Sequence, residues 1–532
     1  METDCIHFKE TGYFSKIILD YLEGDEKLRP FYQYEPKLAS FSEAIEDKNL
    51  PVATRSVLKA SIEAQYKASK INLAKLEAVQ TSVNSLLEVD TYTITTGHQL
   101  CLFTGPLYFI YKIVSVIKLC RELKSKYPEC HFVPVYWMAT EDHDFAEINH
   151  FKLNGKKFEW NTDQKGAVGR MKLDGLEEIF ASFSESLSEY SSNGEELKTL
   201  FQEAYLKHEN LADATRYLVN ELFADYGVVI VDGDDSELKK LFAPIVKKEL
   251  LTEFSSHQVD EQSKQLAKEY KIQVNPREIN LFYLTDGSRV RIIKEGEGYF
   301  INETGQSFSE TEILKELEDF PERFSPNVLL RPLYQETILP NLAYVGGGGE
   351  LAYWFQLKST FEQMNTPLPV LLLRNSAMWM DEKQSKYFKA LKISLRQLFL
   401  DEGVLLKEWV KQNATEDLLL QNEIEALQKQ YETLAAKAEK IDVTLEPHVQ
   451  AILTRHKKDL QQLSEKLVRA ERRKQTEVGV KVKYLKSTLF PNRGLQERSN
   501  NFSEVYLREG REMVSQLLEM FDIPAHEFYL IS

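Results

Sequence analysis

Short runs of apolar and β-branched residues recur between residues 91 and 373 and end at turn residues. Runs of this kind predict buried strands. They lie at residues 91–96, 131–138, 227–231, 342–345 and 370–373. Helical periodicity between the first two predicts a helix from about residue 107 to 123, with Thr104 as its N-cap and Pro106 in its first turn. Strand, helix and strand in succession are typical of a parallel sheet, so the pattern predicts an α/β core.

Outside this core, the pattern predicts helices and one hairpin. Residues 1–90 are expected to be mostly helical, because apolar residues recur at helical spacing and turn residues are few. Alternating residues around positions 286–287, Asp-Gly, predict a β-hairpin over residues 280–293. Ser309 and Glu312 have the spacing of a capping box and predict the start of a helix.

The region from residue 384 to 490 has a different period. Apolar residues alternate at spacings of four and three over residues 420–441 and again over residues 453–470. This is the spacing of a coiled-coil seam. A break is expected at Pro447. The two arms therefore predict an antiparallel helical hairpin, or part of one shared between two subunits.

These patterns divide the chain into five expected segments. They are residues 1–150, a helical N-terminus with the first half of the core; 151–325, connecting insertions that carry the strand 227–231; 326–383, the second half of the core with a glycine-rich turn; 384–490, the coiled coil; and 491–532, a C-terminal segment that returns to the core.

The composition is that of an ordinary globular protein. Of 532 residues, 43% are hydrophobic and 28% charged, which excludes a wholly disordered or collagen-like chain. The net charge of -16 repels a phosphate backbone, so no nucleic-acid partner is expected. Four cysteines without a CxxC pair favour a reducing compartment. Residues 1–9 do not resemble a signal peptide and residues 107–120 are too short to span a bilayer, so a cytoplasmic protein without a membrane partner is expected.

Polar residues gather where the predicted strands end, which is where open parallel sheets bind ligands. After the first strand come His98, Gln99, Thr104, Gly105, Tyr108 and Lys112. The start of the following helix offers free N–H groups, and Lys112 can reach an anion, so this segment suits a phosphate. An ordinary capped helix with Lys112 in solvent is the alternative.

A second polar cluster follows the second strand. It contains Glu141, Asp142, His143 and Asp144. One interpretation is a substrate site that binds an amine and moves protons. Another is a metal site, because His143, Glu147 and His150 have the spacing of one helix face. Acidic capping of a helix is the third. No cysteine or second histidine pair supports a metal, so none is expected.

A glycine run over residues 346–349 follows the fourth strand. Glycines let the backbone approach a ligand closely, although this run matches neither the dinucleotide fingerprint nor the P-loop. The candidate binding residues around it are Arg331, Gln335, Tyr344, Gly346, Gly347, Gly348 and Glu350. A structural ion pair is the alternative for Arg331. Residues 232–235, at the end of the third strand, include three acidic residues. They could bind a ribose or an ammonium group, but ordinary turn chemistry is the favoured interpretation.

The second coiled-coil arm is basic. Residues 451–493 carry twelve Lys or Arg against four Asp or Glu. Such an arm can contact RNA. A solvated coiled-coil face is favoured, because no aromatic residues interleave with the basic ones before Tyr484.

Four segments together resemble one family. They are residues 95–108 (TTGHQLCLFTGPLY), 134–144 (PVYWMATEDHD), 331–335 with 343–350 (RPLYQ and AYVGGGGE) and 495–498 (LQER). On these motifs the chain resembles the BshC family of bacillithiol cysteine ligases over nearly its whole length. The resemblance implies a Rossmann-type parallel sheet core like that of class I aminoacyl-tRNA synthetases, connecting insertions and an α-helical coiled coil that helps to form a homodimer.

The resemblance also implies a reaction. Cysteine is joined to the amino group of glucosaminyl-malate in the last step of bacillithiol synthesis. A free carboxylate does not form an amide without activation, so ATP is the expected cosubstrate, although the His-x-Gly-His and Lys-Met-Ser-Lys-Ser motifs of the synthetases are absent. A coiled-coil scaffold with a degenerate nucleotide-binding core and an RNA-binding synthetase relative are the alternatives.

The expected roles are assigned residue by residue. Lys112 and the turns at Gly105 and Gly347 are expected at the phosphates. His143 is expected to be the general base toward the amine, with Asp142 or Asp144 orienting it, and His98 is a further catalytic candidate.

Overall fold

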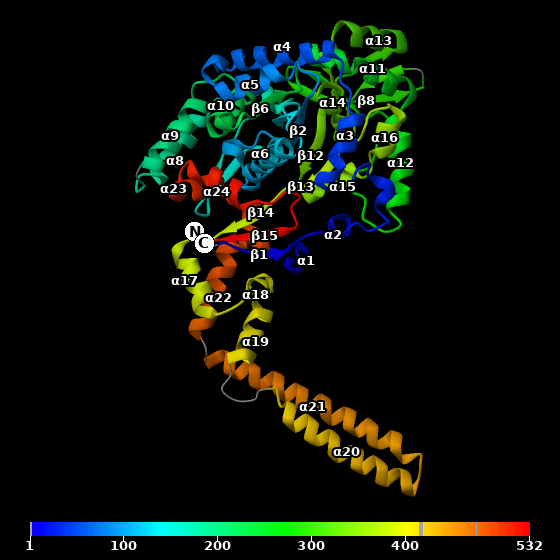
Figure 1. Ribbon diagram of the computed structural model, residues 1–532, viewed down its shortest axis with the longest axis vertical. Helices are drawn as coiled ribbons and strands as arrows, with labels where there is room; N and C mark the ends of the chain where they lie inside the picture. The colour runs from blue at the N-terminus through cyan, green and yellow to red at the C-terminus, as the bar shows by residue number, and fades with distance from the viewer. Residues whose placement is uncertain (1–2, 191, 297, 414–418, 475) are drawn as a thin grey trace.

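The computed structural model describes residues 3–190, 192–296, 298–413, 419–474 and 476–532. Figure 1 shows an α/β body and a long helical hairpin that projects away from it. The N-terminus and the C-terminus lie side by side where the body meets the helices that lead to the hairpin. None of the helices in the described ranges combines the length and apolar character that a bilayer crossing needs.

The five predicted core strands form one parallel sheet. They are β2 (Thr91–His98), β3 (His131–Met138), β6 (Val229–Asp232), β12 (Asn341–Gly346) and β13 (Val370–Leu373). The order across the sheet is β13-β12-β2-β3-β6, and every neighbouring pair is parallel. If these five strands are numbered 1 to 5 in chain order, the order across the sheet from β6 to β13 is 3-2-1-4-5. This is the Rossmann topology. The predicted Rossmann-type core is therefore confirmed.

Helices connect these strands and cover the sheet. They are α4 (Val52–Ala68), α5 (Glu77–Ser85), α6 (Tyr108–Lys126), α10 (Leu211–Phe223), α11 (Ser236–Thr252), α14 (Arg331–Ile338), α15 (Gly348–Trp354) and α16 (Lys358–Gln363). All eight residues of β2 are buried, as expected for a strand with both faces covered. The predicted helix between the first two strands is α6, which packs against β2 and β3.

The start of α6 differs from the prediction. Its N-cap is Leu107, and Thr104 lies earlier, in a short 3-10 turn. Phe103, Thr104 and Gly105 all have positive φ, so the chain turns sharply before the helix begins. Thr104 is thereby carried away from the helix start, and its hydroxyl is buried without a hydrogen-bond partner among the described residues.

The insertion between β6 and β12 forms a second sheet. Its strands are β7 (Leu281–Thr285), β8 (Ser288–Glu295), β9 (Gly298–Ile301), β10 (Gln306–Ser309) and β11 (Phe324–Pro326). All neighbours are antiparallel, in the order β10-β9-β8-β7-β11. The β7–β8 pair confirms the hairpin predicted around Asp286, and α13 (Glu310–Asp319) begins with the predicted Ser309–Glu312 capping box.

The N-terminal region contains one strand that was not predicted. β1 (Thr3–His7) pairs with β15 (Glu527–Ile531), which runs parallel to β14 (Ser376–Trp379). Residues 1–90 are mostly helical, as predicted, and β1 is the exception, because its strand partner lies at the other end of the chain and leaves no local signal. The helices before β2, besides α4 and α5, are α1 (Phe8–Thr11), α2 (Lys16–Glu23) and α3 (Phe41–Asp47).

Smaller elements complete the body. They are α7 (Phe145–Ile148), β4 (His150–Leu153), β5 (Lys156–Glu159), α8 (Leu176–Ser186), α9 (Ser192–Tyr205), α12 (Phe254–Leu266), α23 (Phe502–Glu509) and α24 (Glu512–Met520). α24 packs on α6, so the C-terminal segment returns to the core.

The predicted coiled coil is an antiparallel hairpin of α20 (Gln421–Ile441) and α21 (Leu445–Lys474). The turn falls at residues 442–444, and Pro447 lies in the first turn of α21, so the break predicted at Pro447 is wrong by a few residues. Proline is tolerated there because the first N–H groups of a helix have no intrahelical partner. The helices that join the hairpin to the body are α17 (Glu382–Leu391), α18 (Leu395–Phe399), α19 (Glu402–Asn413) and α22 (Thr476–Leu489).

Candidate active site

A cavity opens where the strand order of the parallel sheet reverses, between β2 and β12. Its volume is about 650 Å³, which suits a small molecule. The predicted site residues that line it are His98, Gln99, Tyr108, Lys112, Glu141, Asp142, Arg331, Tyr344, Gly347, Gly348 and Glu350. The carboxyl ends of three neighbouring strands thus meet around one space, as open α/β sheets arrange their ligand sites.

Six predicted residues do not line this cavity. They are Thr104, Gly105, His143, Asp144, Gln335 and Gly346. The Gly105 carbonyl accepts a bond from Asn501, and the Gly105 N–H donates to the carbonyl oxygen of Leu102 at 2.9 Å, so this N–H is already bonded within the protein. Gln335 is fully buried and accepts a bond from Arg331 at 3.1 Å. His143 lies at the rim, where it contacts a cavity residue that the sequence did not indicate, Arg289.

The cavity wall is strongly cationic. The basic side chains are Lys112, Arg277, Arg289, Arg291, Arg331, Arg374 and Arg498, against three carboxylates, Glu141, Asp142 and Glu350. Sequence reasoning missed five of these arginines. Arg374 directly follows β13, so its position at a strand end could have indicated it. Arg498 lies in the LQER segment, so the family motif could have indicated it. Arg277, Arg289 and Arg291 come from the insertion and have no comparable local signal.

Lys112 is engaged by a carboxylate at the centre of the site. Its Nζ lies 2.6 Å from Glu350 Oε2 and 2.8 Å from the carbonyl oxygen of Gly97. Glu350 also accepts bonds from the Tyr344 hydroxyl at 2.6 Å and the Gly347 N–H at 2.8 Å. Burial lowers the pKa of Lys112. Burial alone would raise the pKa of Glu350, but Lys112 and the hydrogen bonds from Tyr344 and Gly347 together outweigh it and the pKa falls.

This pairing bears on the phosphate roles expected for Lys112 and Gly347, which stay predictions. The positive charge of Lys112 is compensated within the protein, and the Gly347 N–H is already bonded to Glu350. The Gly347 N–H is thus occupied, whereas Lys112 keeps one N–H beyond its contacts with Glu350 and Gly97, so a phosphate would have to share Lys112 with Glu350. The pair ties α6 to the start of α15 across the point where the strand order reverses.

Three buried polar atoms of cavity residues lack a hydrogen-bond partner among the described residues. They are His98 Nε2, Arg331 Nη2 and Arg374 Nε. Buried polar groups are nearly always bonded, so such atoms in a cavity indicate a ligand. The pKa of His98 is far below its usual value, first because the ring is buried and then because Lys112 and Arg374 repel a further positive charge. His98 is therefore neutral at pH 7.

The loop after β3 is held from two sides. Glu141 forms a buried ion pair with Lys239, which also donates to the carbonyl oxygen of Phe324 at 2.7 Å. Burial raises the pKa of Glu141. Asp142 Oδ2 accepts a bond from Gln99 at 2.8 Å, so the two predicted clusters are joined directly.

The helix-face spacing that suggested a metal site as an alternative is not realised at this loop. His143 precedes α7, which spans only four residues, and His150 begins β4, so His143, Glu147 and His150 do not share a helix face. The described residues contain no group of three His, Cys, Asp or Glu side chains that could hold a metal ion.

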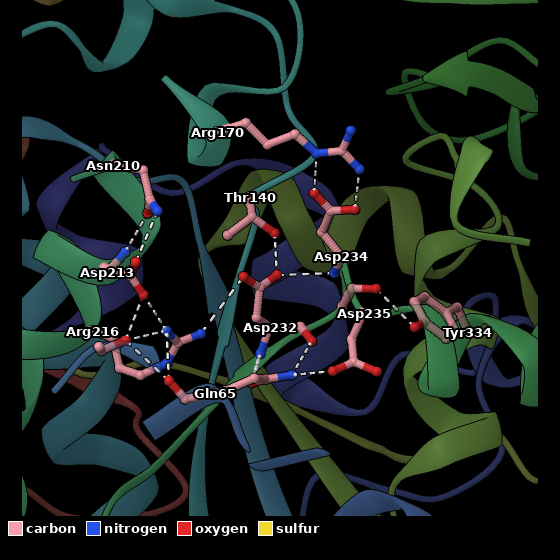
Figure 2. A network of polar contacts seen from close by, with 12 residues as sticks. Gln65, Thr140, Arg170, Asn210, Asp213, Arg216, Asp232, Asp234, Asp235 and Tyr334 are labelled. Carbon is pink, nitrogen blue, oxygen red and sulfur yellow. Dashed lines mark hydrogen bonds and ion pairs between the residues drawn. The ribbon is translucent and has the colours of Figure 1, made fainter. Parts of the chain in front are cut away.

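The acidic residues at the end of β6 bond to other residues of the protein. Part of this is the turn chemistry that was favoured, since the Asp234 N–H donates to Asp232 Oδ1 at 2.9 Å. Figure 2 shows Asp232 between Thr140, which donates to it, and Arg216, 3.6 Å away. Arg170 donates two bonds of 2.7 Å each to Asp234. Asp235 caps α11. The network fixes residue 140, at the carboxyl end of β3, and so positions the loop that carries Glu141 and Asp142.

A Rossmann-type sheet with a cationic cavity where its strand order reverses has the usual place of a small-molecule site in this fold class, and here it is joined to a coiled-coil hairpin. Residues 1–375 match the family model described as "Bacillithiol biosynthesis BshC, N-terminal Rossmann-like domain", and residues 377–532 match the C-terminal coiled-coil domain of the same family. The chain belongs to the BshC family and is a ligase of bacillithiol biosynthesis.

Similar proteins carry the name "Putative cysteine ligase BshC". One from Flavobacterium psychrophilum is 48% identical over 534 residues, covering 100% of this chain and 99% of the relative. One from Flavobacterium johnsoniae is 47% identical, with 98% and 97% covered. One from Cytophaga hutchinsonii is 40% identical, with 97% and 96% covered. The predicted family and enzyme class are confirmed. The likeness to class I aminoacyl-tRNA synthetases and the absence of nucleic-acid binding stay predictions.

Proposed function

We propose that this ligase joins the carboxylate of cysteine to the amino group of glucosaminyl-malate, which gives bacillithiol. The observation that carries the proposal is the surplus of positive charge in the cavity. Glucosaminyl-malate brings two carboxylates and cysteine brings a third, so the substrates together are anionic. The names of the relatives support cysteine as one substrate.

Three arginines are available for these anions. Arg277, Arg291 and Arg498 line the cavity, and within the described residues none of them has a carboxylate at ion-pair distance. The guanidinium fork matches a carboxylate with two parallel hydrogen bonds. An unpaired arginine in a partly enclosed cavity is therefore a ready site for a carboxylate arm of the substrate.

ATP is our proposed source of activation. ATP would supply the activation as an acyl-adenylate: the cysteine carboxylate would take the α-phosphate with release of pyrophosphate, and AMP would leave when the amine attacks. The unpaired arginines fit a polyphosphate as well as a carboxylate, since both present anionic oxygens. Arg277, Arg291 and Arg498 are thus the residues that would hold it.

Product formation tests the proposal directly. The purified protein is incubated with cysteine and glucosaminyl-malate, with and without ATP, and bacillithiol is measured by mass spectrometry. We expect product only with both substrates and ATP, and none when glucosamine replaces glucosaminyl-malate. Product from glucosamine would refute the anionic recognition, and product without ATP would refute the activation step.

A homodimer in the cytoplasm belongs to the same proposal. Leu434 and Leu463 on the hairpin are 48% and 47% exposed, which leaves apolar surface for a second copy. A coiled coil commonly buries such residues against a partner helix. The four cysteines form no disulfide, which suits a reducing compartment.

A further inference from the structure

The β7–β8 hairpin of the insertion brings an arginine to the loop that follows β3. Arg289 Nη1 lies 3.0 Å from Nδ1 of His143. A guanidinium group has only N–H donors and stays charged, so this contact requires Nδ1 to accept. When a neutral imidazole accepts at Nδ1, its proton sits on Nε2.

Arg289 is held by groups other than His143. Its Nε donates to Ser325 Oγ at 3.1 Å, and its Nη2 donates to the carbonyl oxygen of Pro326 at 3.0 Å. The guanidinium carbon lies 4.0 Å from the centre of the Phe282 ring. Ser325 and Pro326 belong to β11, which pairs with β7, so the inserted sheet alone fixes the guanidinium.

The acids beside His143 do not orient its ring, contrary to the expectation from the sequence. Asp142 Oδ1 is 3.7 Å from Nδ1, longer than a hydrogen bond, and accepts the backbone N–H of His143 at 2.7 Å. Its other oxygen accepts from Gln99. In the described part of the chain, the side chain of Asp144 forms no hydrogen bond to the ring.

We propose that Arg289 is a positioning residue that holds His143 in the Nε2–H form, so that His143 donates a hydrogen bond in the ligase reaction and is not its general base. The role in the reaction rests on the proposed function, whereas the tautomer does not. The consequence is that an element inserted into the Rossmann core sets the protonation of a residue at the cavity rim.

The local charges agree with this assignment. Burial lowers the pKa of His143, and the charge of Arg289 lowers it further. Together they outweigh Asp142 and Asp144, which raise it. The ring is therefore neutral at pH 7. Its one lone pair is occupied by Arg289, so His143 has no free site at which to accept a proton from the amine.

Nitrogen NMR tests the tautomer without any substrate. The ten histidines are labelled with nitrogen-15, and His143→Gln identifies the signals of His143. We expect the wild-type ring to be protonated at Nε2 alone. In Arg289→Met we expect a mixture of tautomers and a higher pKa of His143. An unchanged His143 signal in Arg289→Met overturns the proposal.

Arg291→Met is the matched control for this experiment. Arg291 lies two residues further along β8 and lines the same cavity, and the described structure gives it no contact with His143. Its loss removes the same charge from the site without removing the hydrogen bond. We expect the His143 tautomer to be unchanged. A shift as large as that in Arg289→Met would mean that general electrostatics, and not the contact, sets the tautomer.

Two substitutions of His143 separate a donor from a base. Glutamine keeps an N–H donor near the position of Nε2 but cannot take up a proton. We expect His143→Gln to retain activity within about tenfold of wild type and His143→Ala to lose about a hundredfold or more. Equal losses would support the base and overturn the donor role. If wild-type protein forms no product under any condition, the proposed function fails, and the NMR result still decides the tautomer.

Discussion

Replacing Glu497 by alanine tests how the C-terminal segment stabilises the cavity wall. Glu497 Oε1 lies 2.6 Å from Arg374 Nη2, and the two side chains are only 1% and 5% exposed. Its other oxygen accepts the N–H of Ala377 at 3.2 Å. Burial lowers the pKa of Arg374, but Glu497 outweighs this and raises it. Removing one partner of a buried ion pair leaves an uncompensated charge and costs about 3–5 kcal/mol.

Thermal unfolding measures this cost. At about 2.1 cal/mol/K of unfolding entropy per residue, a chain of 532 residues loses about 1 °C of Tm for each kcal/mol, so Glu497→Ala is expected to lower Tm by about 3–5 °C. Glu23→Ala is the control, because it breaks an ion pair with Lys9 whose side chains are 45% and 63% exposed. Exposed pairs contribute little, so its Tm is expected to change by less than about 1 °C. Equal changes in the two variants would refute the argument from burial.

Three further predictions follow from buried charges and exposed apolar residues. Lys112→Met is expected to lower stability to urea by about 3–5 kcal/mol, and adding Glu350→Gln is expected to restore part of it; a double variant as unstable as the single one would contradict the pairing. Burial raises the pKa of Asp232 to about 6. The folded protein therefore holds this proton more tightly than the unfolded chain, whose pKa is about 4, and the free energy of unfolding falls as the pH rises from about 4 to about 6. Asp232→Asn is expected to flatten the urea stability curve between about pH 4 and 7, and an unchanged curve would exclude Asp232 as its source. Leu434→Asp with Leu463→Asp is expected to give monomers in light scattering, and persistent dimers would place the interface elsewhere.

The sequence predicted those parts of the fold whose signals are local. The strands at residues 131–138 and 370–373 are found with the predicted bounds, because each is an apolar run bounded by polar or turn residues. The hairpin around Asp286 and the capping box at Ser309 rest on two to four neighbouring residues. β1 was missed because the strand with which it pairs in the described structure is β15, at the opposite end of the chain.

The location of the site was predictable for a similar reason. Strand ends in a parallel sheet meet at one edge, so the positions of Gln99 and Asp142 followed once the strands were assigned. Their direct hydrogen bond was not predictable, since it depends on how two loops pack. The positions of Arg289 and Arg291 at the cavity could not be predicted either, because they depend on how the second sheet packs against the first.

Assigning chemical roles failed where the predicted residues turned out to be partners of one another. Lys112 and Glu350 were both selected as ligand-binding groups, yet each satisfies the other, and Tyr344 completes the same cluster. A buried lysine and a buried glutamate are each costly alone, so a folded chain that buries both is under pressure to pair them. Arg277 and Arg498 are exposed and Arg291 is half-buried, so water can solvate their charges, and with no carboxylate partner in the described structure they remain available to an anion. Unpaired charge, more than position at a strand end, therefore separates the groups that bind substrate from those that hold the site together.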